Sequence, residues 1–123
     1  MERHPDNEPT PGALIVRPES SLVYFNVDHV CMKILDRMRK EAVPPGLVVL
    51  DLSAAPYVDL HSAHALAGLA DELHKAGSSL QVVEARSGVR DRLRQERLDS
   101  RLGGINRFTS VADAVDGLHH AQA

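Results

Sequence analysis

Short runs of aliphatic and β-branched residues alternate along this chain with longer segments in which apolar residues recur every three or four positions. The short runs predict strands at residues 13–16, 22–25, 47–52, 80–83 and 105–108. The longer segments predict a helix from Val27 to the stop at Pro44, and helices at about 60–76, 89–98 and 110–119. Strands that alternate with helices indicate an α/β fold with a largely parallel sheet.

Two of these segments show where the core should lie. Residues 47–52 are almost uniformly apolar, interrupted only by Asp51, as in a central strand covered by helices on both faces. In the helix at 60–76, which should end at Gly77, the buried stripe is predicted to comprise Ala63, Leu66, Ala67, Ala70 and Leu73. The opposite face should then expose His61, His64, Asp71 and Lys75.

The full predicted order is β-β-α-β-α-β-α-β-α, a mixed and mostly parallel sheet of about five strands with four helices. The first two strands are expected to pair antiparallel across a tight connection. Residues 1–11, which are rich in proline and charge, read as a flexible tail or linker, and residues 12–121 as one domain. Ser110 is the expected N-cap of the last helix.

Composition narrows the function classes. The chain of 123 residues is 43% hydrophobic and 25% charged with a net charge of -3, and no basic field suits a phosphate backbone, so nucleic acid is not expected as a partner. Cys31 is the only cysteine, which rules out an internal disulfide and a thiolate zinc site made by this chain alone. No apolar stretch approaches the ~18 residues of a membrane span. We expect a soluble domain in a reducing, cytoplasmic compartment.

Two stretches of the sequence match motifs of a known family. The first, PGALIVR at 11–17 followed by LVYFN at 22–26, resembles the opening strands of the STAS domain of SulP-family anion transporters, with Ser21 where proline is usual. The second, VVLDLSAAPYVDLHSAHAL at 48–66, is similar to the family's DLSAVPYVDSTGVHAL. VRDRL at 89–93 and FTSVADAV at 108–115 extend the resemblance over about residues 11–117.

This resemblance implies the STAS fold and a cytoplasmic regulatory or protein-interaction domain of a transporter for sulfate, bicarbonate or dicarboxylates. The chain would then be a piece of a longer protein. Its partner would be the membrane domain of the same transporter or a cytosolic regulatory protein. The sequence leaves open whether the domain also forms a homodimer. The alternative is a stand-alone STAS protein resembling an anti-sigma factor antagonist.

The loop that enters the helix at 60–76 is the expected contact site. The resemblance assigns partner binding to Asp59, His61, Ser62 and His64. In anti-sigma factor antagonists the position of His61 holds a phosphorylated serine or threonine, so that regulation is lost here, and Ser62 would be a phosphorylation target one residue further on. Contacts made through the two histidines would vary with pH between about 5 and 8.

Other chemistries are less well supported by the sequence. Asp59, His61 and His64 could ligate a metal, but a capping carboxylate and two solvated histidines explain them better, and no metal or cofactor is expected. Nucleotide or anion binding at the same helix start is opposed by the Asp59 carboxylate. No serine lies on a strained elbow, so we expect no catalytic residues and no enzyme. The arginines of 86–101 could contact an acidic partner or lipid head groups, but Asp91 and Glu96 among them favour a solvated face.

Overall fold

A computed structural model of the protein describes residues 12–98, 102, 111, 112, 114 and 115. The predicted tail at 1–11, the predicted strand at 105–108 and the predicted cap Ser110 lie outside the described residues. Of the predicted last helix, residues 111, 112, 114 and 115 are described, and all four are helical.

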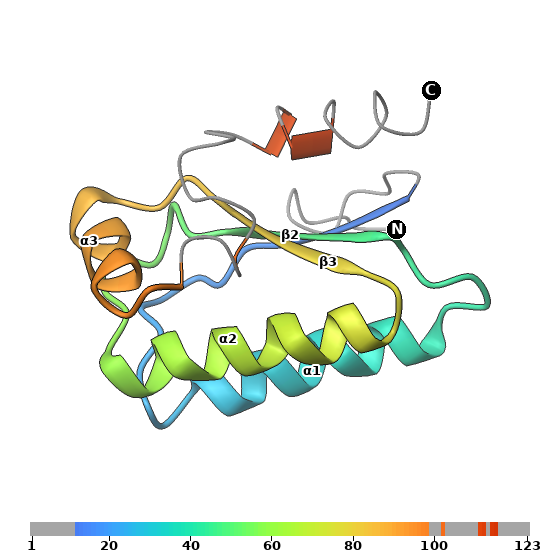
Figure 1. Cartoon of the computed structure of the whole chain (residues 1–123), viewed down its shortest axis with the longest axis horizontal. Helices are drawn as coiled ribbons and strands as arrows, with labels where there is room; N and C mark the ends of the chain where they lie inside the picture. The colour runs from blue at the N-terminus through green and yellow to red at the C-terminus, as the bar shows by residue number, and fades with distance from the viewer. Residues whose placement is uncertain (1–11, 99–101, 103–110, 113, 116–123) are drawn as a thin grey trace.

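A parallel sheet organises the described residues (Figure 1). Its strands are β1 (Ala13–Val16), β2 (Leu47–Asp51) and β3 (Ser79–Val83), in the order β1-β2-β3. Leu14 pairs with Val48, which in turn pairs with Leu80. Every residue of β2 is buried, so the prediction of a central, helix-covered strand is confirmed.

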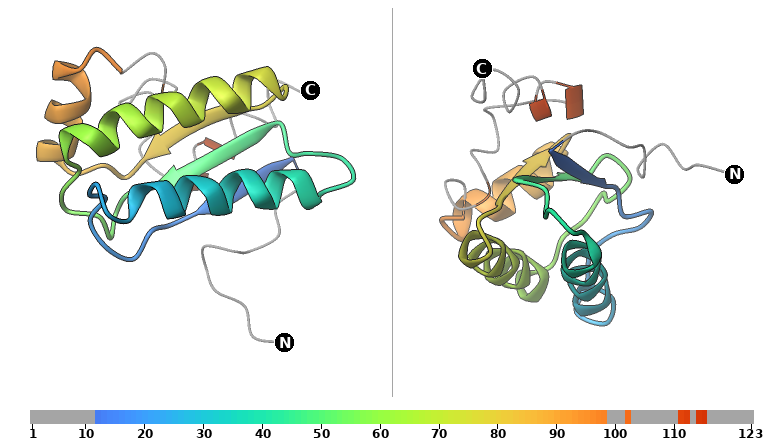
Figure 2. Two further views of the ribbon diagram at one scale, coloured as in Figure 1. Left: turned by 90° about the horizontal axis from the view of Figure 1, so that it is seen from below. Right: turned by 90° about the vertical axis from the view of Figure 1, so that its right-hand side faces the viewer.

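Two long helices cover one face of this sheet. They are α1 (Val27–Lys40) and α2 (Leu60–Lys75), and Figure 2 shows them side by side beneath the strands. The predicted stripe of α2 is buried, while His61, His64, Asp71 and Lys75 are exposed, as expected. After α2 the chain reverses at Gly77, which has φ +85° and whose amide donates to the His74 carbonyl at 3.0 Å.

The third helix and the last helical residues complete the packing. Helix α3 (Ser87–Gln95) lies near the start of α2 and buries Val89 and Leu93. The helical residues 111, 112, 114 and 115 lie on the sheet face opposite α1 and α2 (Figure 2), where Ala114 packs with Ile15 and Val49. Among the described residues, no helix is long and apolar enough to cross a membrane.

The predicted strand at 22–25 is wrong, and so is its antiparallel pairing with the first strand. Leu22 instead forms one isolated parallel bridge with Val58. Beyond it the chain turns into α1, because the Asn26 side chain accepts the Val23 amide at 2.9 Å and the Val27 amide donates to the Val23 carbonyl at 3.0 Å. In the described part of the chain the sheet therefore has three strands, all parallel.

The core prediction can be tested with two leucines of the same helix. Leu66 is fully buried, whereas Leu60 is 48% exposed. Leu66→Ala should lower the free energy of unfolding by about 2–5 kcal/mol through the cavity that it leaves, and Leu50→Ala in β2 should behave alike. Leu60→Ala should change it by less than about 0.5 kcal/mol. Urea unfolding measures all three, and similar values for Leu60 and Leu66 would contradict the core assignment.

Candidate partner-binding site

Asp59 joins two segments that lie far apart in the sequence. It is the N-cap of α2, and its Oδ1 accepts the Ser62 amide at 2.8 Å. Its Oδ2 accepts the Tyr24 amide at 2.9 Å. Two backbone bonds run alongside, from the Leu22 amide to the Tyr57 carbonyl and from the Asp59 amide to the Leu22 carbonyl. The loop before α1 is thereby fastened to the loop before α2.

These hydrogen bonds favour the ionised form of Asp59. Partial loss of water raises the pKa of its carboxyl, but hydrogen bonds from Ser62 and Tyr24, together with nearby His61, outweigh this and hold the pKa below its ordinary value. The half-buried carboxylate also lies at the positive end of α2, so it occupies the place where an external anion or nucleotide phosphate would bind.

Ser62 does not share the exposure of its neighbours. Its exposed fraction is 0%, because it lies one helical turn before Leu66 on the buried face of α2. In this folded form the hydroxyl is not exposed to a kinase or to a partner. The roles of Ser62 as a phosphorylation target and as a contact residue stay predictions.

The two histidines lie at the surface, as predicted, but they differ in their contacts. His61 is exposed. The His64 side chain is 59% exposed, and its Nε2 lies 3.1 Å from Oε1 of Glu96. Glu96 is the C-cap residue that directly follows α3. This link between two helices was missed by the sequence analysis. Among the described residues, no group of three or more His, Cys, Asp or Glu side chains could hold a metal ion.

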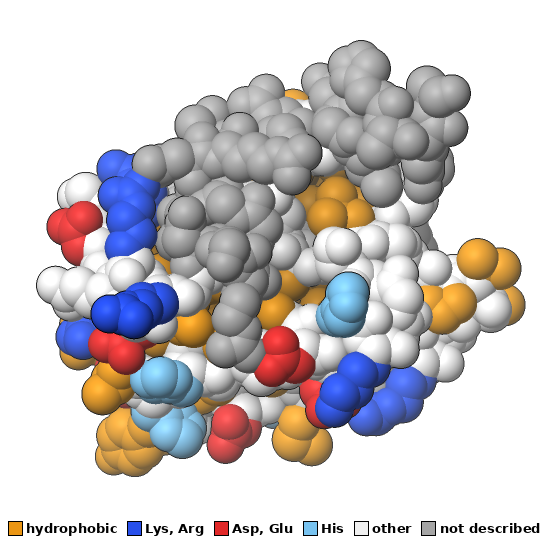
Figure 3. Space-filling model, viewed as in Figure 1, with side chains coloured by type: hydrophobic (Ala, Val, Ile, Leu, Met, Phe, Trp, Pro, Cys, Tyr) orange, Lys and Arg blue, Asp and Glu red, His pale blue; other side chains and the backbone are white. Residues whose placement is uncertain are grey.

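Exposed apolar side chains surround the same loops, and the sequence analysis missed them as a site. Tyr24 is 70% exposed, Phe25 76%, Tyr57 51% and Leu60 48%. We call these four residues the apolar patch. Tyr24 and Phe25 meet edge to face with ring centroids 5.5 Å apart. Figure 3 shows hydrophobic and histidine side chains together at the end of the molecule where α2 begins. Clustered exposed aromatic residues are typical of protein contact surfaces.

Comparison with known proteins identifies the family. The model of the STAS domain matches residues 4–114. The chain belongs to the STAS domain family. Its curated relatives include high affinity sulfate transporter 2 of Stylosanthes hamata, 26% identical over 94% of this chain and 19% of the relative. Sulfate transporter 2.1 of Arabidopsis thaliana is 29% identical over 93% of this chain and 18% of the relative. This STAS domain therefore spans about a fifth of the curated relatives that it matches.

Solved structures agree on the fold. The murine Solute Carrier 26 family member A9 anion transporter, in its inward-facing state, matches 92% of this chain with a TM-score of 0.79 and 23% identity, over 18% of its own length. The SulP transporter STAS domain from Vibrio cholerae matches 86% of this chain with a TM-score of 0.68 and 16% identity, over 80% of its own length. The predicted resemblance to SulP-type STAS domains is confirmed.

Asp59 accepts hydrogen bonds from the Ser62 and Tyr24 amides, and we call this pair of bonds the Asp59 clasp. The contribution of the clasp to stability can be measured separately from that of the Asp59 charge. Asp59→Ala should lower the melting temperature at pH 7, because it removes the acceptor for both Ser62 and Tyr24. Asp59→Asn keeps an acceptor and should lose less. Because the folded pKa is lowered, the carboxylate stabilises the fold above its unfolded pKa of about 3.9, and this stabilisation disappears as the pH falls through the folded pKa.

Melting curves from pH 7 down to pH 3 measure both effects. The difference between the native chain and Asp59→Asn should shrink as the pH falls below about 4. Asp91→Asn, on the exposed side of α3, is the control for loss of one negative charge. A constant difference across this pH range would mean that the Asp59 charge does not stabilise the fold.

Proposed function

We propose that this STAS domain is the cytoplasmic regulatory and protein-interaction domain of a SulP-type anion transporter. The proposal rests on the alignment with two sulfate transporters. More than nine-tenths of this chain aligns with each of them, and the aligned region is less than a fifth of each transporter's length. The rest of such a protein would hold the membrane spans and the transport chemistry. Sulfate, bicarbonate or a dicarboxylate would be the transported anion.

The apolar patch, with Asp59, His61 and His64 at its rim, is the proposed contact surface. A cluster of exposed aromatic rings is costly to leave in water, and burying it against a partner recovers that cost. The Asp59 clasp fixes the backbone of Tyr24, so little ordering is needed on binding. The occupant that we propose is the cytoplasmic side of the transporter's own membrane portion, since that is the part of the relatives that this chain lacks.

The described side chains also favour a domain without catalysis. Burial, with a smaller contribution from Asp28, raises the pKa of Cys31 to about 11, so the thiol is not a nucleophile at neutral pH. Ser62, the hydroxyl nearest the histidines in the sequence, is buried. We therefore propose a role in contact and regulation rather than in a reaction.

The coding sequence around this domain tests the proposal directly. We expect membrane-spanning segments fused in frame upstream of Met1, amounting to most of the length of a sulfate transporter. Transcript sequencing through the 5′ end measures this. A stop codon directly upstream, with an independent start at Met1, would overturn the transporter assignment and favour a stand-alone STAS protein that switches a regulatory partner.

The contact surface can be tested with matched apolar substitutions. Phe25→Ser combined with Tyr57→Ser should leave the melting temperature nearly unchanged, because both rings are already exposed. The double variant should bind the separately expressed membrane portion about tenfold more weakly or worse, and should reduce sulfate uptake by the full-length protein. Val43→Ser is the control, since Val43 is 85% exposed in the loop between α1 and β2, at the other end of the sheet.

Three results would contradict this surface. Equal loss with Val43→Ser would point to general loss of apolar area rather than to one contact. A large fall in melting temperature for the double variant would make the rings structural. Unchanged binding to the membrane portion, with loss of binding to a cytosolic protein, would show that the proposed occupant is wrong.

A further inference from the structure

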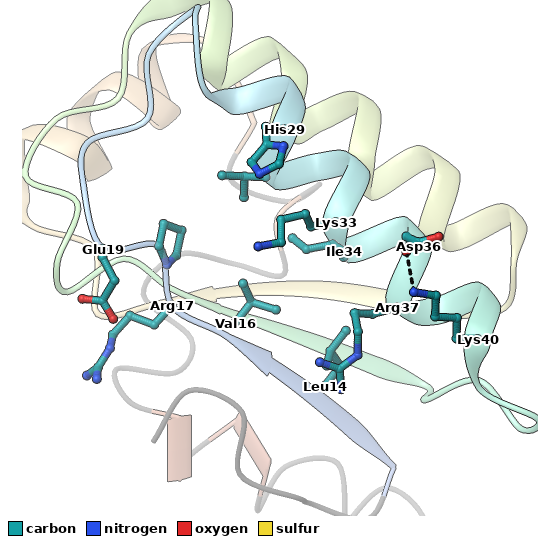
Figure 4. Close-up of a pocket in the computed structure, with 12 residues that line it drawn as sticks. Leu14, Val16, Arg17, Glu19, His29, Lys33, Ile34, Asp36, Arg37 and Lys40 are labelled. Atoms are coloured by element: carbon teal, nitrogen blue, oxygen red, sulfur yellow. Dashed lines mark ion pairs between the residues drawn. The ribbon is translucent and has the colours of Figure 1, made fainter. Parts of the chain in front are cut away.

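A cavity of about 490 Å³ lies away from the apolar patch, between α1 and β1. Its walls come from β1, the loop that follows it and the outer side of α1 (Figure 4). Among the described strands, β1 is at the edge of the sheet, which leaves this flank of α1 without a neighbouring helix. The volume is in the range of small-molecule sites, about 300–1,000 Å³.

The inner wall of the cavity is apolar. Leu14 and Ile34 are buried there at 9% and 1% exposure, and half-buried Val16, Pro18 and Val30 extend the apolar surface toward the opening. An apolar wall offers water no hydrogen bonds, whereas a short hydrocarbon chain would be stabilised by burying its apolar surface against the wall.

The rim of the cavity is cationic. Four cationic and two acidic side chains line it, in a chain whose net charge is -3. Lys40 is neutralised by Asp36, with Nζ 3.0 Å from Oδ2. This leaves Arg17, Lys33 and Arg37 against the single carboxylate of Glu19.

Within the described residues, no acidic side chain forms an ion pair with any of these three cations. In the part of the chain that the structure describes, neither Lys33 nor Arg37 forms an ion pair or a side-chain hydrogen bond. The Nε of Arg17 is buried and has no hydrogen-bond partner there. Figure 4 shows Lys33 and Arg37 reaching from α1 over the side that carries Val16 and Leu14, with Arg17 and Glu19 at one end. Two cations without an ion-pair partner in the described residues, on one side of an apolar cavity, favour an anionic ligand that would form charged hydrogen bonds with both.

We propose that this cavity binds an amphipathic anion, a phosphate monoester or carboxylate that carries a short apolar chain. The chain would lie on Leu14, Val16 and Ile34, and the anionic head would bind Lys33 and Arg37. The source is either a soluble metabolite of this class or the head region of an anionic lipid. The site is separate from the apolar patch and does not depend on the transporter assignment.

Calorimetric titration of the 123-residue chain with octyl phosphate, below its micelle concentration, tests the proposal. We expect one binding site, with octanol about tenfold weaker or worse because it lacks the charge. Lys33→Gln combined with Arg37→Gln should weaken octyl phosphate by about tenfold or more. Lys75→Gln is the control, because Lys75 is an exposed cation at the end of α2 and does not line the cavity. Circular dichroism checks that each variant folds.

A second arm uses phosphatidylglycerol vesicles and phosphatidylcholine vesicles to identify the source. Octyl phosphate binding that Lys33→Gln with Arg37→Gln weakens by about tenfold or more, without binding to phosphatidylglycerol vesicles, supports a soluble ligand. Binding to phosphatidylglycerol vesicles alone, abolished by the same variant and retained in Lys75→Gln, supports a lipid head group. Failure to bind either probe, or binding that the double variant leaves unchanged, overturns the proposal. These binding results have no bearing on the tests of the apolar patch, because the cavity and the patch are separate surfaces.

Discussion

The burial of β2 is the constraint from which the rest of this domain follows. All five residues from Leu47 to Asp51 are buried, and backbone groups in that position must find partners inside the protein. Parallel strands on both sides provide those partners, and the crossover helices that parallel pairing requires cover the sheet. Because the three described strands are parallel, the loops that follow them and precede α1, α2 and α3 all lie at the carboxyl ends of the strands.

Asp59 turns that gathering of loops into a defined surface. A loop of ten residues joins β1 to α1, and without a fastening it would cost conformational entropy to hold in one shape. The bonds of Asp59 to the Tyr24 and Ser62 amides, beside the single bridge between Leu22 and Val58, fasten it to α2. The exposed rings of Tyr24 and Phe25 are held by this arrangement rather than by burial of their own.

Periodicity in the sequence was sufficient for the elements that bury a continuous face. The strand β2, the buried stripe of α2 and its end at Gly77 were all predicted, because each is set by residues close together in the chain. The segment 22–25 was assigned wrongly to a strand because β-forming residues favour an extended run, whereas the Asn26 side chain and a bridge to Val58 decide the outcome. The bridge to Val58 is a tertiary contact, and the turn depends on the single side chain of Asn26. Composition reveals neither interaction.

The candidate site likewise combines features that local spacing predicts with features that depend on tertiary packing. The outward placement of His61 and His64 follows from helical spacing, but the contact of His64 with Glu96 depends on how α3 packs, 32 residues further along the chain. Ser62 is a different case, since its spacing of four residues from Leu66 already placed it on the buried stripe, whereas its predicted roles need an exposed hydroxyl. The family resemblance drew attention to its hydroxyl, although the periodicity argued against its exposure.

The burial of Ser62 and the presence of His61 together change how this surface could be regulated. A phosphorylated loop would add a dianionic group beside Asp59, where like charges repel, and so would switch a contact on or off. Here the neighbouring side chain is an imidazole and the next hydroxyl is buried, so neither of these two positions presents an exposed serine in the folded form. The exposed side chains here are those of the apolar patch together with His61 and His64, beside the half-buried Asp59. A surface of exposed rings without an exposed serine fits the contact that we propose with the membrane portion of a transporter better than a contact that a kinase must release.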